Sequence, residues 1–256
     1  MTLHLVRLGV DPLALARFAV ERRIDDDDDG YALHCALVER FGDAAPRPFR
    51  YLPDHRRGPH VLGYAGDWAA MQDAAALPIA DDRLDGLFDT PEAQPMPAAW
   101  RIGARYAFEV RARPVVRFGK QVRAAREGRT AAWQHRAGEM DAYVAACERA
   151  VRATDGTGDV TREAVYADWL RTRLAGAATI DEVALRLFRR VRARRSTHRA
   201  AGGARTRAVE GPDAVLAGTL TIADADAFAA QLARGIGRHA AFGYGMLLLS
   251  PPGRTA

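Results

Sequence analysis

Hydrophobic residues near the start of the chain alternate with the period of two that is typical of a β-strand. Leu3 and Leu5 fall on one face of this strand, and Val6, Leu8 and Val10 fall on the other. The alternation therefore predicts that the chain begins with a strand, which ends before an aspartate and a proline.

Two helices are predicted after this strand. The first begins at Asp11, which can cap a helix N-terminus, and Pro12, which suits the first turn. Five consecutive aspartates follow at residues 25–29, and we expect a solvated loop there rather than a carboxylate metal site. The second helix is predicted over residues 31–41.

The second helix brings two chemically versatile side chains to the border between core and solvent. At about 100° per residue, Leu33, Leu37 and Phe41 form the buried arc. His34 lies at the edge of this arc, and Tyr31 lies just beyond it. An isolated helical histidine is more often a half-buried, hydrogen-bonded residue than a catalyst. The helix alone therefore leaves both interpretations of His34 open.

A hairpin and an irregular segment complete the first half of the chain. Two short strands at 48–52 and 60–64 are joined through a polar turn. The residues after them, through Pro97, are rich in alanine, aspartate and proline and show no regular hydrophobic pattern. We therefore predict a domain boundary here, with one domain at residues 1–98 and a second at 99–256.

The second half is predicted to have the order β-α-β-β-α-β, with one extra helix counted as an insertion. The expected elements are a strand at 104–111, a basic loop at 119–123, helices at 130–152 and 161–174, a long hairpin at 183–195 and 214–222, a helix at 224–234 and a strand at 246–249. The first half can be given the same order. The pattern therefore predicts an α+β fold.

A glycine-rich stretch precedes the last strand. Four glycines lie within eleven residues: Gly235, Gly237, Gly243 and Gly245. Two of them flank Arg238 and His239, and a backbone without Cβ atoms can approach an anion such as phosphate closely. A helix before and a strand after this stretch do not fit a nucleotide-binding fingerprint. A helix C-cap followed by a turn without a ligand is the alternative.

The long hairpin concentrates basic residues near its tip. Seven arginines lie in the first strand and just before the return strand: Arg189, Arg190, Arg192, Arg194, Arg195, Arg205 and Arg207. A solvated edge seldom needs so many like charges together. Contact with the phosphate backbone of a nucleic acid is therefore favoured over a merely solvated edge.

Composition alone does not separate RNA binding from codon bias. The net charge is +5, and of the 37 basic residues Lys120 is the only lysine. Arginine suits phosphate, but an arginine-rich chain is also typical of a GC-rich genome. Cys35 and Cys147 are too few for a disulfide framework or a zinc site. The first residues show no charged region followed by a long apolar core, and the sequence has no run of about 18 uncharged apolar residues, so we expect neither a leader nor a membrane span. A cytoplasmic protein without membrane contact is expected.

Three motifs are spread over the chain. They are Tyr31-x-x-His34-x-x-Leu37-x-x-x-Phe41; Gly103-x-x-Tyr106-x-Phe108-x-Val110-Arg111-Ala112-x-Pro114 with Gly119-Lys120; and Gly218-x-Leu220-Thr221-Ile222-x-Asp224, continued by Gly235-Ile236-Gly237 and Gly243-x-Gly245-x-Leu247-x-Leu249. Each motif is weak alone. Their order and placement together resemble the CasE family, the repeat-specific endoribonucleases of type I-E CRISPR systems.

The resemblance implies two tandem ferredoxin-like domains, related to RNA recognition motifs, that grip the hairpin of a CRISPR repeat. The second domain would carry the inserted helix. The family's catalytic histidine falls on His34 and its accompanying tyrosine on Tyr31. RNA contacts are expected from Lys120, the basic hairpin and the glycine-rich stretch. Partners are the CRISPR repeat RNA hairpin, the mature guide RNA and other subunits of a Cascade-type effector complex.

The chain departs from the family pattern at three places. An insertion at residues 11–30 lengthens the connection before the His34 helix, and a helical segment near 160–174 enlarges the second domain. Ala240 stands where family members often carry a lysine in the glycine-rich stretch. This last difference leaves the cationic role of the stretch to Arg238 and His239.

The expected chemistry is RNA cleavage without a metal or other cofactor. An imidazole titrates near neutral pH, so His34 could act as general base or general acid. Tyr31 would position the scissile nucleotide or donate a hydrogen bond, while Arg238 and nearby backbone N–H groups would stabilise the transition state. The products would be a 2′,3′-cyclic phosphate and a 5′-hydroxyl. The alternative is a non-catalytic RNA-binding subunit of a CRISPR ribonucleoprotein complex.

Overall fold

A computed structural model describes residues 2–24, 29–79, 81–118, 121–122, 134–135, 138–153, 160–197 and 205–253. Lys120 and the aspartates at 25–28 lie outside the described residues. Only the backbone is described for five of the hairpin arginines: Arg192, Arg194, Arg195, Arg205 and Arg207. Within the described part of the chain, no helix is long and apolar enough to cross a membrane.

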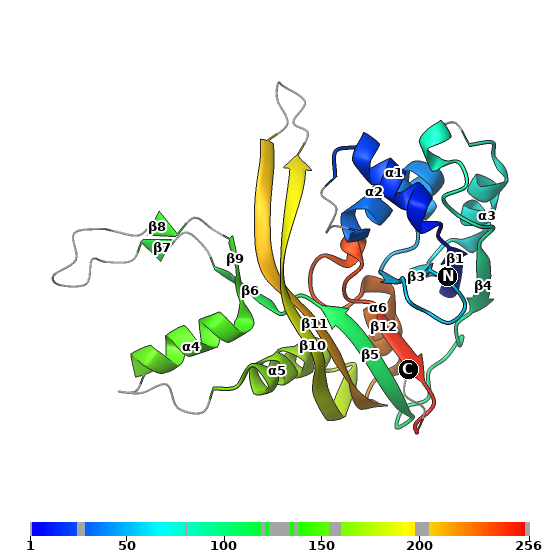
Figure 1. Cartoon of the computed structure of the whole chain (residues 1–256). Helices are drawn as coiled ribbons and strands as arrows, with labels where there is room; N and C mark the ends of the chain where they lie inside the picture. The colour runs from blue at the N-terminus through cyan, green and yellow to red at the C-terminus, as the bar shows by residue number, and fades with distance from the viewer. Residues whose placement is uncertain are drawn as a thin grey trace.

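The first part of the chain forms a four-stranded antiparallel sheet with the order β2-β3-β1-β4 (Figure 1). Its strands are β1 (His4–Gly9), β2 (Phe49–Leu52), β3 (His60–Ala65) and β4 (Glu92–Pro95). The helical connections are α1 (Pro12–Glu21), α2 (Asp29–Phe41) and α3 (Trp68–Ala76), with short 3-10 turns η1 (Gly42–Ala44) and η2 (Asp82–Leu84). This connectivity and strand order are those of a ferredoxin-like domain, as the sequence predicts.

Strand β1 is apolar on both faces because each face meets a different core. Val6, Leu8 and Val10 are buried under the helices of the first sheet. Leu3 and Leu5 pack instead against the hydrophobic core of the second sheet. The predicted division of the two faces is therefore confirmed, and the first sheet lies between its own helices and the second half of the chain.

The second half repeats the same strand order, β10-β11-β5-β12. Its strands are β5 (Arg105–Ala112), β10 (Ala178–Thr197), β11 (Arg205–Ile222) and β12 (Leu247–Ser250), and its helices include α5 (Arg162–Leu174) and α6 (Ala225–Arg234). Between β5 and α5 lie helix α4 (Ala142–Ala153) and four short strands: β6 (Val115–Phe118), β7 (Gln121–Val122), β8 (Gln134–His135) and β9 (Gly138–Asp141). The second ferredoxin-like domain with an inserted helix is thus as predicted, but the inserted helix is α4, which is accompanied by two-stranded sheets. The segment near 160–174, which was expected to enlarge the domain, is α5, and its apolar side chains lie in the core of the second sheet.

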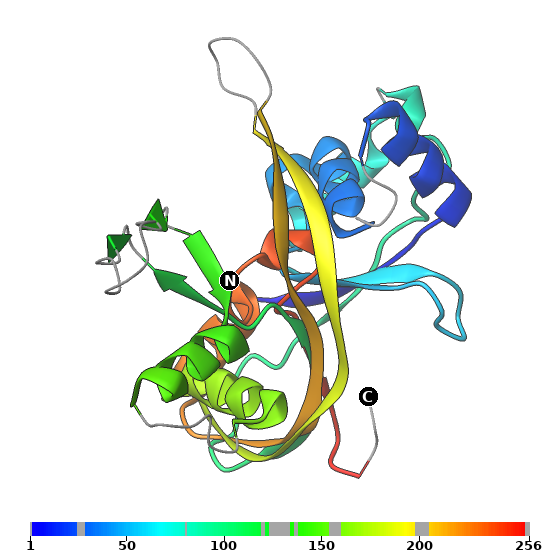
Figure 2. The same cartoon turned by 60° about the vertical axis from the view of Figure 1, so that its left-hand side comes forward.

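Strands β10 and β11 form a ribbon that extends well beyond the rest of their sheet. They pair from Ala178 opposite Ile222 to Thr197 opposite Arg205. Figure 2 shows that the ribbon is strongly curved. The backbone of the seven hairpin arginines predicted to bind RNA therefore lies in the projecting part of this ribbon (Figure 1).

The segment after β3 shows no regular hydrophobic pattern, yet it contains α3 and the edge strand β4, which complete the predicted order of the first half. Helix α3 buries only Met71 within an alanine-rich sequence, and β4 is mostly exposed, so neither shows a clear hydrophobic period. One interpretation of the sequence was wrong. A helix was expected over 130–152, but Gly138–Asp141 is strand β9, and the helix begins at Ala142. The boundary at residues 98/99, between β4 and β5, stays a prediction.

Two polar contacts join the sheets. The Tyr64 hydroxyl on β3 donates to the carbonyl of Leu247 on β12 at 2.8 Å. Arg50 on β2 donates to Glu109 on β5 at 3.1 Å. These two hydrogen bonds fix the first sheet against the second.

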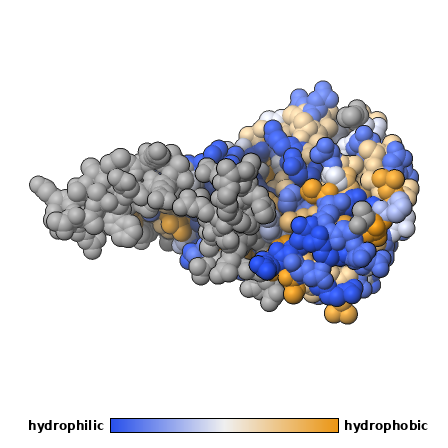
Figure 3. All heavy atoms as spheres, turned by 90° about the horizontal axis from the view of Figure 1, so that it is seen from above, coloured by the Kyte–Doolittle hydropathy of each residue, from blue (hydrophilic) through white to orange (hydrophobic). Residues whose placement is uncertain are grey.

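Seen from above, hydrophilic and hydrophobic side chains are interspersed on the described surface (Figure 3).

Candidate active site

Helix α2 packs on the first sheet through the arc that the sequence predicts. Its buried residues are Ala32, Leu33, Ala36, Leu37 and Phe41. Tyr31 and His34 are both half-buried and lie at the border of this arc. The helix therefore holds both side chains rigidly while leaving each partly accessible to solvent.

The glycine-rich stretch meets α2 at these two side chains. Its 3-10 turn η3 (Ala240–Phe242) brings the Phe242 ring to 4.9 Å from the ring centroid of His34, edge to face. Phe242 also lies 5.9 Å from Tyr31, and the Tyr31 and His34 rings are 6.3 Å apart. Both views show η3 beside α2 (Figures 1 and 2). Residues about 200 positions apart thus form one aromatic cluster.

The environment of His34 favours its neutral form. Burial lowers the pKa of His34 below its ordinary value, and the positive charge of Arg47 lowers the pKa further. Among the described residues, no hydrogen bond reaches its ring nitrogens and no carboxylate pairs with it. A neutral imidazole with a free lone pair can accept a proton from a substrate hydroxyl.

Tyr31 is held in its neutral form as well. Burial raises the pKa of the Tyr31 hydroxyl, and the neighbouring Cys35 thiol raises the pKa further. Burial also raises the pKa of Cys35. Tyr31 can therefore donate a hydrogen bond near His34, while Cys35 is a packed thiol rather than a nucleophile.

The glycine-rich stretch is a closed loop that fits tightly against the protein. The N–H of Ile236 donates to the Gly245 carbonyl at 2.8 Å, and the N–H of Gly245 donates to the Arg111 carbonyl at 2.7 Å. A methyl group at Gly237 would lie 2.8 Å from ring atom Cη2 of Trp169. One at Gly245 would lie 2.5 Å from the Ile236 carbonyl oxygen. These two glycines are thus required by packing, and RNA contacts by the loop stay a prediction.

Two side chains of the loop, Arg238 and His239, contact one carboxylate that sequence reasoning missed. Glu139 on β9 pairs with Nε of Arg238, and its Oε2 accepts from Nε2 of His239 at 2.9 Å. The hydrogen bond from His239, together with both positive charges, lowers the pKa of Glu139 to about 2 despite burial. The sequence held no signal for this contact, because Glu139 was assigned to a helix.

The face of the second sheet that carries Arg111 holds an arginine cluster around a buried carboxylate. Asp213 on β11 accepts two hydrogen bonds from Arg111, at 2.7 and 2.6 Å, and one from Arg189 at 2.6 Å. Arg190 pairs with Glu210 at 3.1 Å across the ribbon. Arg189 and Arg190 are more than half exposed at their side chains. The base of the ribbon thus presents arginines fixed by carboxylates, with positive charge facing solvent.

Two further arginines extend this cluster toward the first sheet. Burial, and then the charge of Arg111, lower the pKa of Arg50 to about 10. Arg113 is almost fully buried, and its Nε has no hydrogen-bond partner among the residues that the structure describes. Both Arg111 and Arg113 lie near the Tyr244 ring, at 4.9 and 5.7 Å from its centroid. The arginine cluster therefore reaches the glycine-rich stretch at Tyr244.

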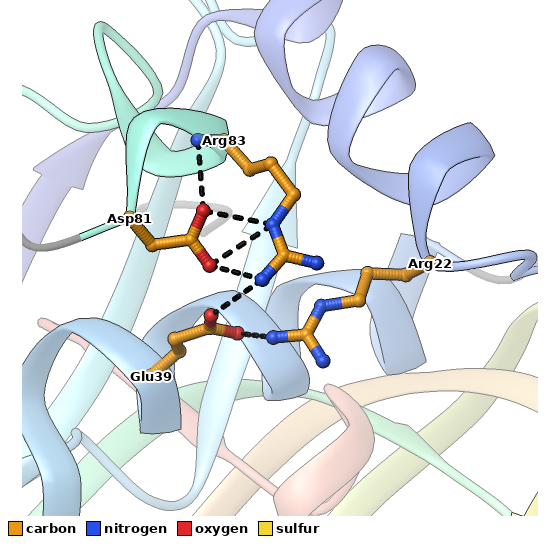
Figure 4. Close-up of polar contacts among 4 residues, drawn as sticks. All are labelled: Arg22, Glu39, Asp81 and Arg83. Carbon is orange, nitrogen blue, oxygen red and sulfur yellow. Dashed lines mark hydrogen bonds and ion pairs between the residues drawn. The ribbon is translucent and has the colours of Figure 1, made fainter.

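A polar network supports the helix that carries His34 (Figure 4). Glu39 on α2 pairs with Arg22, which follows α1, and with Arg83 of η2 at 3.5 Å. Asp81 accepts from Nε of Arg83 at 2.7 Å. The network ties α1, α2 and η2 together on the surface of the first domain. It restrains the helix that holds the candidate catalytic residues.

No cluster of three or more histidine, cysteine, aspartate or glutamate side chains able to hold a metal ion occurs in the described ranges. Of the five consecutive aspartates, only Asp29 falls in these ranges, as the first residue of α2. The groups described around His34 are therefore the Tyr31 phenol, the Arg238 guanidinium and the His239 imidazole, with the Glu139 carboxylate bound to the last two.

The chain resembles known proteins over nearly its whole length. The family model described as CRISPR associated protein matches residues 3–251. No curated protein matches the sequence significantly. A solved structure of the CRISPR endoribonuclease Cse3 bound to a 19-nucleotide RNA is 21% identical with a TM-score of 0.57, covering 98% of this chain and 100% of the other.

Two more solved structures have the same fold. Cas6e from Escherichia coli K-12 is 18% identical with a TM-score of 0.56, covering 97% of this chain and 99% of the other. A chain of a CRISPR RNA-guided surveillance complex is 18% identical with a TM-score of 0.52, over 97% and 99% of the two chains. The family resemblance that the three motifs indicate is thereby confirmed. The chain belongs to the CRISPR associated protein family.

Proposed function

We propose that this chain is a metal-independent endoribonuclease that binds the hairpin of a CRISPR repeat and cleaves precursor CRISPR RNA. The observation that carries the proposal is the contact of His34 on α2 with Phe242 of the glycine-rich loop. A half-buried histidine, which has no polar partner in the described part of the chain, sits next to a loop that carries Arg238 and His239. The fold shared with an RNA-bound CRISPR endoribonuclease supports the substrate class.

His34 is the general base of this reaction. Its pKa lies below the ordinary value, so the imidazole is neutral at neutral pH and can remove the proton of the 2′-hydroxyl upstream of the scissile phosphate. The 2′-oxygen attacks the phosphorus, and the bond to the 5′-oxygen breaks. The products are a 2′,3′-cyclic phosphate and a 5′-hydroxyl.

Tyr31 and Arg238 act around the reacting phosphate. The Tyr31 hydroxyl stays protonated because burial raises its pKa, so it donates a hydrogen bond to the scissile nucleotide. The Arg238 side chain is about half exposed, so it can add a phosphate contact while its Nε stays on Glu139. A guanidinium next to a pentacoordinate phosphate stabilises the charge that develops in the transition state.

RNA is held on the basic face of the second sheet and along the ribbon. Arg189 and Arg190 are described there, and the remaining ribbon arginines continue the same strands toward the tip. Such contacts recognise the phosphate backbone and make affinity dependent on salt. The glycine-rich loop and Lys120 are proposed to add contacts near the cut.

We also propose that the product stays bound and that the protein acts as a subunit of a Cascade-type complex in the cytoplasm. A chain of a solved surveillance complex shares this fold, which supports this assignment. After cleavage, the mature guide RNA would remain on the same basic surface. The other subunits of the complex would then assemble along it.

The proposed activity is tested with a labelled CRISPR repeat RNA in excess EDTA. We expect one discrete cut, with a 2′,3′-cyclic phosphate on the upstream fragment. A substrate with a 2′-deoxy nucleotide just upstream of the scissile phosphate should bind equally well and remain intact, because it lacks the nucleophile. Binding without any cut would instead indicate a non-catalytic RNA-binding subunit. Strict dependence on Mg²⁺ would replace the His34 mechanism with metal-activated water.

A further inference from the structure

A second histidine faces the same aromatic ring as His34. The His239 ring lies 6.0 Å from the Phe242 centroid, while His34 lies 4.9 Å from it. The His239 side chain is 15% exposed and comes from the loop, whereas His34 comes from α2. Two imidazoles from opposite halves of the chain thus flank one site.

The backbone and one carboxylate fix the orientation of His239. Its φ is +67°, in the left-handed region that few residues other than glycine adopt, so the fold imposes this conformation. Glu139 accepts from Nε2 at 2.9 Å. Because Nε2 is taken by Glu139, Nδ1 is the nitrogen that remains for a substrate.

We propose that His239 is the general acid of the cleavage reaction and that Glu139 is its positioning residue. This inference rests on the endoribonuclease activity proposed above. His34 takes the proton of the 2′-hydroxyl as the 2′-oxygen forms its bond to phosphorus. The bond between phosphorus and the 5′-oxygen breaks, and the proton on Nδ1 of His239 passes to that oxygen. His34 then releases a proton to water, and His239 takes one up.

The surroundings of the two histidines differ as the roles of general base for His34 and general acid for His239 require. His34 faces the positive charge of Arg47, and none of the described carboxylates pairs with it. His239 donates to Glu139, whose pKa of about 2 keeps it ionised at any working pH. An ionised carboxylate makes a charge-assisted hydrogen bond to an imidazolium, and it fixes the ring as that ring loses its other proton. Paired groups with opposed environments are the usual arrangement for acid and base.

The test uses a repeat RNA whose scissile 5′-oxygen is replaced by sulfur. A thiolate leaves without protonation, so this substrate needs no general acid. His239→Asn is the main variant, because asparagine tolerates the left-handed conformation. We expect cleavage of ordinary RNA to fall about 10²- to 10⁴-fold, and cleavage of the thio-substituted RNA to stay close to that of the unchanged protein. His34→Ala should be slow on both substrates.

Glu139→Gln separates positioning from mere structural support. It should slow cleavage of ordinary RNA by less than His239→Asn and leave the thio-substituted RNA unaffected. Arg238→Ala is the control from the same loop, and it should slow both substrates because it acts on phosphate charge. Circular dichroism and RNA affinity, measured on each variant, identify any variant that has lost its fold.

The outcomes are distinct. Equal losses on both substrates for His239→Asn, with unchanged affinity, would overturn the assignment of the general acid. Rescue of His34→Ala by the thio-substituted RNA, without rescue of His239→Asn, would also overturn it. If the unchanged protein cuts neither RNA, the proposed function itself fails. If it cuts both and His239→Asn has full activity, only this inference fails.

Discussion

Replacing Asp213 by asparagine should destabilise the second domain strongly. The Asp213 side chain is fully buried and accepts two hydrogen bonds from Arg111 and one from Arg189. Asparagine has the same shape, but it removes the negative charge and one of the acceptor oxygens. Arg111 and the buried Arg50 would then lie close together without their shared counter-charge.

The expected cost follows from this geometry. Breaking a buried ion pair by removing one partner costs about 3–5 kcal/mol. The asparagine side chain would keep one acceptor, so we expect about 3 kcal/mol, which corresponds to a fall in Tm of about 6–12 °C for a domain of this size. Asp168→Asn is the matched control, because Asp168 pairs with Arg171 at 2.8 Å on an exposed helix surface. That change should cost less than about 1 kcal/mol.

The pH dependence of this effect has a definite sign. Burial alone would raise the pKa of Asp213, but the hydrogen bonds and charges of Arg111 and Arg189 lower it below the ordinary value. A lowered pKa stabilises the fold above the unfolded pKa, and that stabilisation is lost as the pH falls through the native pKa. The Tm difference between the unchanged protein and Asp213→Asn should therefore shrink below about pH 4.

Thermal unfolding followed by circular dichroism measures both variants. The reasoning is refuted if Asp213→Asn loses no more Tm than Asp168→Asn at pH 7. It is also refuted if the difference grows on acidification.

Three further predictions concern the glycine-rich loop, the general base His34 and the β10–β11 ribbon. Gly237→Ala combines a φ of +78° with a clash against Trp169, and it should lower the free energy of unfolding by about 2–5 kcal/mol. Gly103→Ala is the control, because Gly103 has a φ of +79° and open space around it, and it should lower that free energy by about 1–2 kcal/mol. Equal losses of Tm would refute the packing argument. Arg47→Gln should raise the pKa of His34 and move the acid limb of the single-turnover rate to higher pH, and an unmoved limb would contradict this. Alanine replacement of three ribbon arginines, Arg192, Arg194 and Arg195, should weaken the dependence of RNA affinity on salt concentration. An unchanged slope would make the ribbon a solvated edge.

Local signals in the sequence predicted most of the fold. Asp11 caps a helix through its side chain, as the sequence predicts. Thr161 and Asp224 cap α5 and α6 in the same way, each by accepting from a backbone N–H. The amphipathic α6, predicted at 224–234, buries Phe228 and Leu232. Capping and helical period act within a few residues, so a sequence displays them directly.

Elements with weak local signals were missed. Strand β4 is held by backbone pairing with β1, and its side chains are largely exposed. Strand β9 (Gly138–Asp141) has no hydrophobic alternation and is defined by its pairing with β6. Such strands are stabilised by pairing with a strand that is distant in the sequence. The hydrophobic pattern of only four residues cannot reveal that pairing.

The candidate site was predictable in part. The helical wheel and the family resemblance both singled out His34 and Tyr31, but neither indicated their contact with Phe242. The contact of Glu139 with His239 joins residues 100 positions apart and was not foreseen. These contacts arise from the way two domains and an insertion pack together, and periodicity carries no information about that packing.

The central claim is tested most directly by single-turnover cleavage of repeat RNA with His34→Ala. The account predicts a rate lower by about 10²- to 10⁴-fold with unchanged RNA affinity, because only the proton transfer is lost. His55→Ala, in the turn between β2 and β3, is the matched histidine control and should cleave normally. Undiminished cleavage by His34→Ala, or an equal loss in both variants, would contradict the assignment of His34 as the catalytic base.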